Sequence, residues 1–165
     1  MRLPLALAAL LALAAPALAD GDDARGADKG TFGLGIILGE PTGVSAKLYL
    51  SDDRAIQAAA GSAFLGGGLE LDADYLLHPY ILQTRDSFVL PVYVGPGVRV
   101  IDYNDGRSSS FFALGVRAVG GLLFDFKAVP LDAFVEAGPV LEYQFKDGAG
   151  LAIKLHAGAG VRYYF

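Results

Sequence analysis

Apolar and polar residues alternate with a period of two along nearly the whole chain, and this pattern predicts an all-β protein. The alternation falls into eight segments separated by turn sequences, and several segments reach the ten or so residues that cross a bilayer when tilted. One face of the segments carries Leu, Val, Ile, Phe and Tyr, whereas the other carries Gly, Ala and charged residues. These observations predict an eight-stranded antiparallel up-and-down transmembrane β-barrel.

Composition limits the alternatives. The chain has 165 residues, of which 53% are hydrophobic and 19% charged, so we expect one folded domain rather than two domains or a disordered chain. Its formal net charge of -5 argues against a nucleic-acid partner. The sequence has no cysteine, which excludes a disulfide framework, a thiolate metal site and the acylated cysteine of a lipoprotein.

The N-terminal residues have the pattern of an export signal. Arg2 precedes an apolar run from Leu3 to Ala15, and small residues at 17 and 19 form the A-x-A pattern of a cleavage site. A membrane anchor is the alternative, but this run is short of the roughly 20 residues that a spanning helix needs. We therefore predict a signal peptide over 1–19, a polar segment over 20–29 without periodicity, and the barrel over 30–165.

The eight predicted strands follow the apolar rows and end at turn signals. The rows of the first, second and fourth strands are Phe32, Leu34, Ile36, Leu38; Val44, Ala46, Leu48, Leu50; and Leu69, Leu71, Ala73, Tyr75, Leu77. Turn signals bound them at Glu40-Pro41-Thr42-Gly43, Ser51-Asp52-Asp53, Gly66-Gly67-Gly68 and His78-Pro79. The predicted ranges are 30–39, 43–51, 54–63 and 67–77, with an inward loop from His78 to Ser87.

The second half of the chain continues in the same way, and its last strand is the clearest. Every second residue from Phe165 back to Leu151 is apolar or aromatic, whereas the intervening row carries all the charges. Turn signals fall at Asn104-Asp105-Gly106, Val129-Pro130 and Lys146-Asp147-Gly148. The predicted ranges are 87–101, 110–125, 131–144 and 149–165.

Closure of the sheet follows from the membrane setting, because the edge amides of an open sheet have no partner in lipid. A soluble ligand-carrying barrel is the competing structure, but it would place large apolar residues inside. Here the face opposite the apolar rows holds small and charged residues, which suit the narrow lumen of eight strands. The even strand number leaves both termini on the periplasmic side.

The charged residues on the inward face form the candidate site. Five positive charges stand against six negative ones, so we predict an ion-pair network that fills the lumen, with a narrow pore as the alternative. His156 lies on the same face. The predicted set is Lys47, Glu70, Asp72, Asp74, Arg99, Arg117, Asp132, Glu136, Glu142, Lys154, His156 and Arg162.

An enzyme is the third and weakest interpretation. Lipid-modifying barrels use His with Ser and an acid, but no Ser follows Ser110 and His78 lies in a predicted turn. The glycines at 66–68 lack the Lys-Ser/Thr of a phosphate loop. We expect no catalytic, cofactor or metal site. Adhesion would need long outward loops, and only 101–110 is of useful size.

The last six residues, Gly160-Val161-Arg162-Tyr163-Tyr164-Phe165, resemble the insertion signal of Gram-negative outer-membrane barrels. The stretches 35–47 and 129–136 add a resemblance to small eight-stranded outer-membrane proteins of OmpA/OmpX-like architecture, over residues 30–165. The resemblance implies a monomer in outer-membrane lipid, inserted by the barrel assembly machinery, which would read Val161, Tyr163 and Phe165. It implies no activity and therefore no catalytic residue.

Overall fold

The computed structural model describes residues 29–63, 68–103, 111–145 and 150–165. The predicted signal peptide, most of the polar segment and parts of three predicted loops lie outside these residues. The strands are β1 (Phe32–Gly39), β2 (Thr42–Ser51), β3 (Arg54–Ser62), β4 (Leu69–Thr84), β5 (Phe88–Tyr103), β6 (Phe111–Phe126), β7 (Leu131–Phe145) and β8 (Gly150–Tyr164). Among the described residues, no helix is long and apolar enough to cross a membrane.

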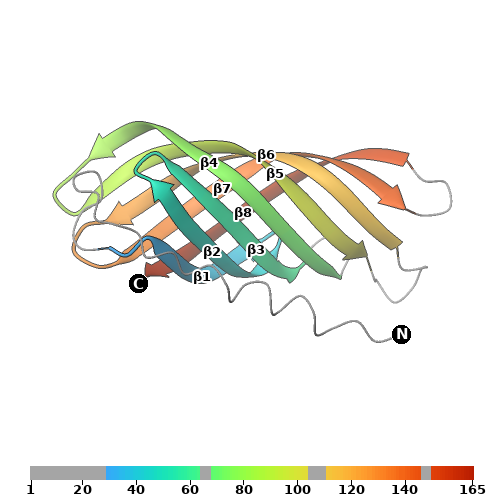
Figure 1. Cartoon of the computed structure of the whole chain (residues 1–165), viewed down its shortest axis with the longest axis horizontal. Coiled ribbons are helices and arrows are strands. Elements are labelled where there is room, and N and C mark those ends of the chain that lie inside the picture. The colour runs from blue at the N-terminus through green and yellow to red at the C-terminus, as the bar shows by residue number, and fades with distance from the viewer. Residues whose placement is uncertain (1–28, 64–67, 104–110, 146–149) are drawn as a thin grey trace.

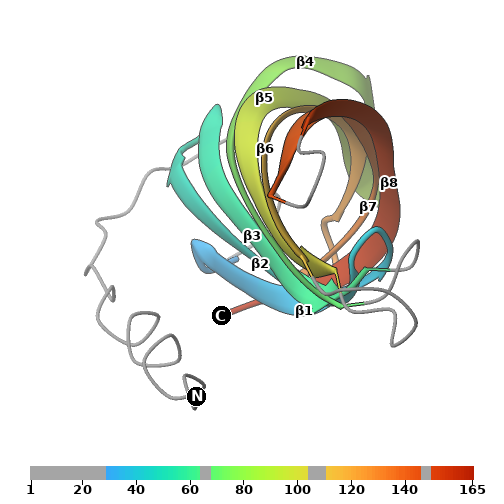
Figure 2. The same cartoon turned by 90° about the vertical axis from the view of Figure 1, so that its right-hand side faces the viewer.

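The eight strands form one closed barrel in which each strand pairs antiparallel with its neighbours in the chain (Figure 1). Viewed from the end, they form a ring that β1 and β8 close (Figure 2). The prediction of an all-β, eight-stranded, antiparallel up-and-down barrel is therefore confirmed. The last backbone bond of the closing pair runs from Phe165 N to Phe32 O, at 3.0 Å.

The barrel closes with an offset of ten residues. Paired residues can be followed from Ile36 on β1 around the sheet through Val44, Ala60, Leu71, Val100, Leu114 and Tyr143 to Leu151 on β8. Ile36 itself pairs with Val161, which is ten residues further along β8. Such an offset requires the strands to tilt by roughly 40° from the barrel axis.

Strand β4 is longer than predicted. The predictions of a turn at His78-Pro79 and of an inward loop from His78 to Ser87 were wrong, because β4 continues to Thr84. Pro79 fits there for two reasons: the register with β5 shifts between Leu77 and Tyr80, and the last bond toward β3 is His78 N to Asp53 O. Pro79 therefore sits in a bulge on a free edge, where its missing N–H leaves no ladder bond unmade.

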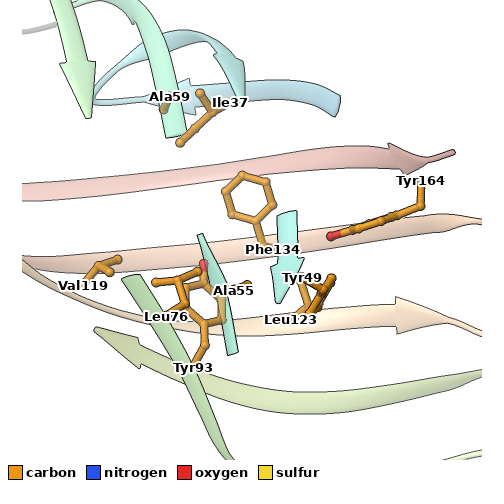
Figure 3. Packing of buried hydrophobic residues seen from close by; sticks show 10 residues of the cluster. All are labelled: Ile37, Tyr49, Ala55, Ala59, Leu76, Tyr93, Val119, Leu123, Phe134 and Tyr164. Atoms are coloured by element: carbon orange, nitrogen blue, oxygen red, sulfur yellow. The ribbon is translucent and has the colours of Figure 1, made fainter. Parts of the chain in front are cut away.

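The inside of the barrel has an apolar layer that was not predicted. Buried side chains from all eight strands form it (Figure 3), toward the end of the barrel where β1 begins and β8 ends. A smaller cluster at the opposite end contains Ala63, Ile101, Tyr103 and Ala113. The first layer consists of Ile37, Tyr49, Ala55, Ala59, Leu76, Tyr93, Val119, Leu123, Phe134 and Tyr164.

Two consecutive glycines on β6 test the assignment of the faces. A Cβ at Gly121 would lie 2.3 Å from the ring of Tyr93 inside the barrel, whereas at Gly120 nothing lies nearer than 3.9 Å. We expect Gly121→Ala to lower the free energy of unfolding by about 1–3 kcal/mol through overpacking, and Gly120→Ala to change it by less than about 0.5 kcal/mol. Urea unfolding in detergent measures both. Equal effects would contradict the inward placement of Gly121.

Candidate functional site: the charged interior

The structure places the predicted charged residues on the inner face of the barrel. Eleven of the twelve are buried, and the side chain of Lys154 is 34% exposed near the end of the barrel where β8 begins. They come from β2, β4, β5, β6, β7 and β8, so the network crosses the lumen.

Two arginines on neighbouring strands hold the centre of this network. Arg99 Nη2 lies 2.5 Å from Glu70 Oε1, and Arg99 Nε lies 3.2 Å from Asp72 Oδ1. Arg117 also pairs with Asp72, and its Nε lies 2.9 Å from Asp74 Oδ1. Because Glu70, Asp72 and Asp74 alternate along β4, they form a column of carboxylates that faces both guanidinium groups.

His156 connects the two arginines to β7. Its Nδ1 lies 3.3 Å from both Arg99 Nη2 and Arg117 Nη1, and its Nε2 lies 3.1 Å from Glu136 Oε1. These contacts fit the tautomer in which Nδ1 accepts from an arginine and Nε2–H donates to the carboxylate. Within the described residues, no serine or threonine hydroxyl bonds to His156, so its contacts are those of a network member.

Glu136 joins the central network to a second group near the apolar layer. Its Oε2 accepts hydrogen bonds from Tyr93 Oη at 2.7 Å and from Gln57 Nε2 at 2.8 Å. Gln57 Oε1 in turn accepts from Arg162 Nη1 at 2.6 Å. Gln57 and Tyr93 are not among the predicted site residues, although both lie on inward rows and their parity along β3 and β5 could have identified them.

Arg162 and Asp132 form the pair at the end of the barrel where β7 begins and β8 ends. Arg162 Nε lies 3.1 Å from Asp132 Oδ1, and the guanidinium carbon lies 4.0 Å from the centroid of the Phe134 ring. The other carboxylate oxygen of Asp132 accepts from Tyr164 Oη at 2.6 Å. The remaining pair, at the opposite end, is Lys154 with Glu142 at 3.5 Å, where Glu142 also accepts from Tyr103 and Gln144.

Lys47 differs from the other predicted members because none of the described carboxylates pairs with it. Its Nζ lies 2.9 Å from His78 Nε2, and 4.6 Å and 5.2 Å from the ring centroids of Tyr49 and Tyr93. The physical reason is position: Lys47 lies in the apolar layer, where aromatic faces and a neutral imidazole are its neighbours. Cation–π attraction supplies part of its stabilisation there.

Glu70, Asp72 and His156 have the composition of a metal site, since their ligand atoms lie within 4.8 Å of one another. Arg99, however, contacts all three of these side chains. The guanidinium therefore occupies the place that a cation would take, and these residues are better described as an ion-pair cluster than as a metal centre.

The predicted assembly residues lie on the outer face at the closing strand. Val161, Tyr163 and Phe165 are 48%, 46% and 69% exposed, and the rings of Tyr163 and Phe165 pack edge to face with centroids 5.0 Å apart. They form a continuous apolar row beside β1.

Comparison with known proteins gives no relative: no family model, no curated protein and no solved structure matches this chain. The fold and the interior therefore define the class, which is a small closed antiparallel β-barrel with an ion-paired lumen.

Neighbouring residues on β6 test the network. Arg117 contacts Asp72, Asp74 and Glu136, whereas Val116 is 59% exposed on the outer face. We expect Arg117→Ala to lower the free energy of unfolding by roughly 3–5 kcal/mol, because it leaves buried carboxylates without a cation. Val116→Ala should cost well under half of that.

Urea titration in detergent compares these two variants. Equally mild effects would show that water reaches the carboxylates, and would favour a pore over a filled lumen. Single-channel recording in planar bilayers provides the second readout, since a filled lumen should give no discrete conductance steps in the unsubstituted protein.

Proposed function

We propose that this protein is an integral outer-membrane β-barrel of a Gram-negative envelope, with a lumen filled by side chains and a structural or accessory role. The observation that carries the proposal is the inverted distribution of its residues. Large apolar side chains are exposed on all eight strands, whereas charged side chains are buried inside.

This distribution suits lipid and not water. Exposed apolar patches on soluble monomers rarely exceed a few hundred Å², and here the apolar surface surrounds the barrel. A closed ladder also satisfies backbone amides without water along the paired parts of the wall, which is the condition for crossing a bilayer. The OmpA/OmpX-like architecture expected from the sequence belongs to this proposal.

The contacts across the lumen support a filled interior over a narrow pore. Arg117 on β6 reaches carboxylates on β4 and β7, and Arg162 on β8 bonds to Gln57 on β3. Side chains from opposite walls therefore meet in the middle of the barrel. The network also uses His156 fully, so we propose no enzymatic role.

The first test concerns location. The signal predicted over 1–19 and the apolar outer face lead us to expect a mature protein that starts at Asp20 and fractionates with the outer membrane. It should also migrate faster on gels when unboiled, because closed barrels resist detergent. Recovery of a soluble periplasmic protein would contradict the proposal.

The second test concerns insertion. We expect Phe165→Ala to slow insertion by the barrel assembly machinery and to leave precursor in the periplasm, because it removes the last side chain of the apolar row. The substitution keeps the backbone bond from Phe165 N to Phe32 O, so closure of the barrel itself is not altered. Phe145→Ala, also an exposed phenylalanine at a strand end, is the control. Pulse-chase assembly rates that are equal for both variants would remove the role of Phe165 as a signal.

A further inference from the structure

One side of the barrel wall is much shorter than the other at the end where β8 begins. Strand β1 ends at Gly39, which pairs with Gly158 of β8. Strand β8 begins eight residues earlier, at Gly150, so its first residues extend beyond the end of β1. The last backbone bond on this side runs from Glu40 N to Ala157 O, at 3.0 Å. Figure 1 shows the β7–β8 hairpin extending far beyond the β1–β2 hairpin. We call this gap above β1 and β2 the notch.

The edge of β8 along the notch has open peptide groups. In an antiparallel strand, alternate residues direct both N–H and C=O to the same neighbour. The carbonyl of Ala157 accepts a bond from the β1 side, so every second residue before it faces the same side. The N–H and C=O groups of Leu151, Ile153 and Leu155 therefore point into the notch, where no described strand pairs with them. Their side chains are 71%, 82% and 73% exposed.

A pocket of about 720 Å³ lies at the foot of the notch, lined by Leu38, Gly39, Thr42, Ser62 and Ala63. Leu38 belongs to the outer face and is 62% exposed, whereas Ala63 is buried in the inner cluster with Tyr103. The pocket is therefore lined both by a residue of the outer face and by a residue of the inner cluster. Its volume is within the range of small-molecule sites.

Position and charge indicate the ligand. The eight residues of β1 fall short of the about 9–11 that a tilted spanning strand needs, so a barrel in a membrane would have its notch at the level of the outer leaflet. Open peptide groups in lipid require a polar partner. Lys154 lies on the same stretch of β8. Its Nζ pairs with the buried Glu142 at 3.5 Å and lies 4.3 Å from the centroid of the Tyr103 ring beside Ala63, but the side chain remains 34% exposed and can meet a second anion.

We propose that the notch binds a single-chain anionic amphiphile of the long-chain fatty acid class, which enters sideways from the outer leaflet. The acyl chain lies in the pocket and along Leu151, Ile153 and Leu155. The carboxylate accepts hydrogen bonds from the open N–H groups of β8 near Lys154. This inference rests on the proposed membrane location.

The absence of cysteine from the sequence allows a single-site fluorescence test. Ser62→Cys places a bimane label at the pocket, and Val98→Cys places it on the outer face of β5, where the wall is complete. Dibromostearate is titrated into vesicles that contain each labelled protein. We expect half-maximal quenching at Ser62→Cys at a roughly tenfold lower mole fraction, which corresponds to about 1.4 kcal/mol of preference.

Two further arms make the test specific. Ala63→Phe, added to Ser62→Cys, fills the pocket and should remove the preference, provided that the variant keeps the mobility of the folded barrel on unboiled gels. The methyl ester of dibromostearate should show a weaker preference, and equal quenching by acid and ester would overturn the carboxylate assignment. Equal quenching at both labelled positions, in protein that has inserted, would overturn the notch site alone. Failure to insert would overturn the membrane location and this site with it.

Discussion

The offset of ten residues with which the hydrogen-bond ladder closes determines the rest of this structure. It fixes the tilt of the strands and, with eight strands, a lumen only wide enough for side chains. At that width an arginine on one wall reaches carboxylates on others, as Arg117 does with Asp74 on β4 and Glu136 on β7. The two strands of the closing pair also differ in length, because β1 has eight residues and β8 has fifteen, so part of β8 has no partner on that side among the described strands.

Burial inside so narrow a lumen requires each charge to have a partner, and the layers of the interior follow from this requirement. The central layer contains most of the acids and the two arginines that share Asp72. Near the end of the barrel where β8 ends, tyrosine hydroxyls complete the hydrogen bonding of carboxylates, as Tyr164 does for Asp132. Lys47 lies where aromatic rings replace carboxylates. The partner that stabilises a buried charge therefore differs between layers: an opposite charge in the centre, a tyrosine hydroxyl for Asp132, and aromatic rings for Lys47.

Alternation along each strand is local, so the sequence alone indicates the number of strands, their faces and which charges point inward. The pairs are not local, because which carboxylate meets Arg99 depends on the register of β4 against β5. The inward position of Tyr93 and Tyr164 also follows from alternation, whereas the carboxylates that their hydroxyls meet depend on how distant strands are placed across the lumen. The sequence at Pro79 predicts a turn because a proline within a strand is acceptable only on a free edge, and that edge exists because β3 begins only at Arg54.

Since the inward charges other than Lys47 are engaged with one another, groups able to meet other molecules lie on the outer wall and at the two rims. The rims differ in kind. At the end where β1 begins and β8 ends, β4 and β5 extend past β3, and Tyr80, Ile81 and Leu82 are exposed there. No described polar or charged group beside these three residues indicates the chemistry of a ligand. At the other end, open peptide groups, an apolar pocket and a partly exposed lysine occur together. That combination of donors, apolar lining and positive charge is chemically selective, and this is why the notch and not the lumen is the place to look for a ligand.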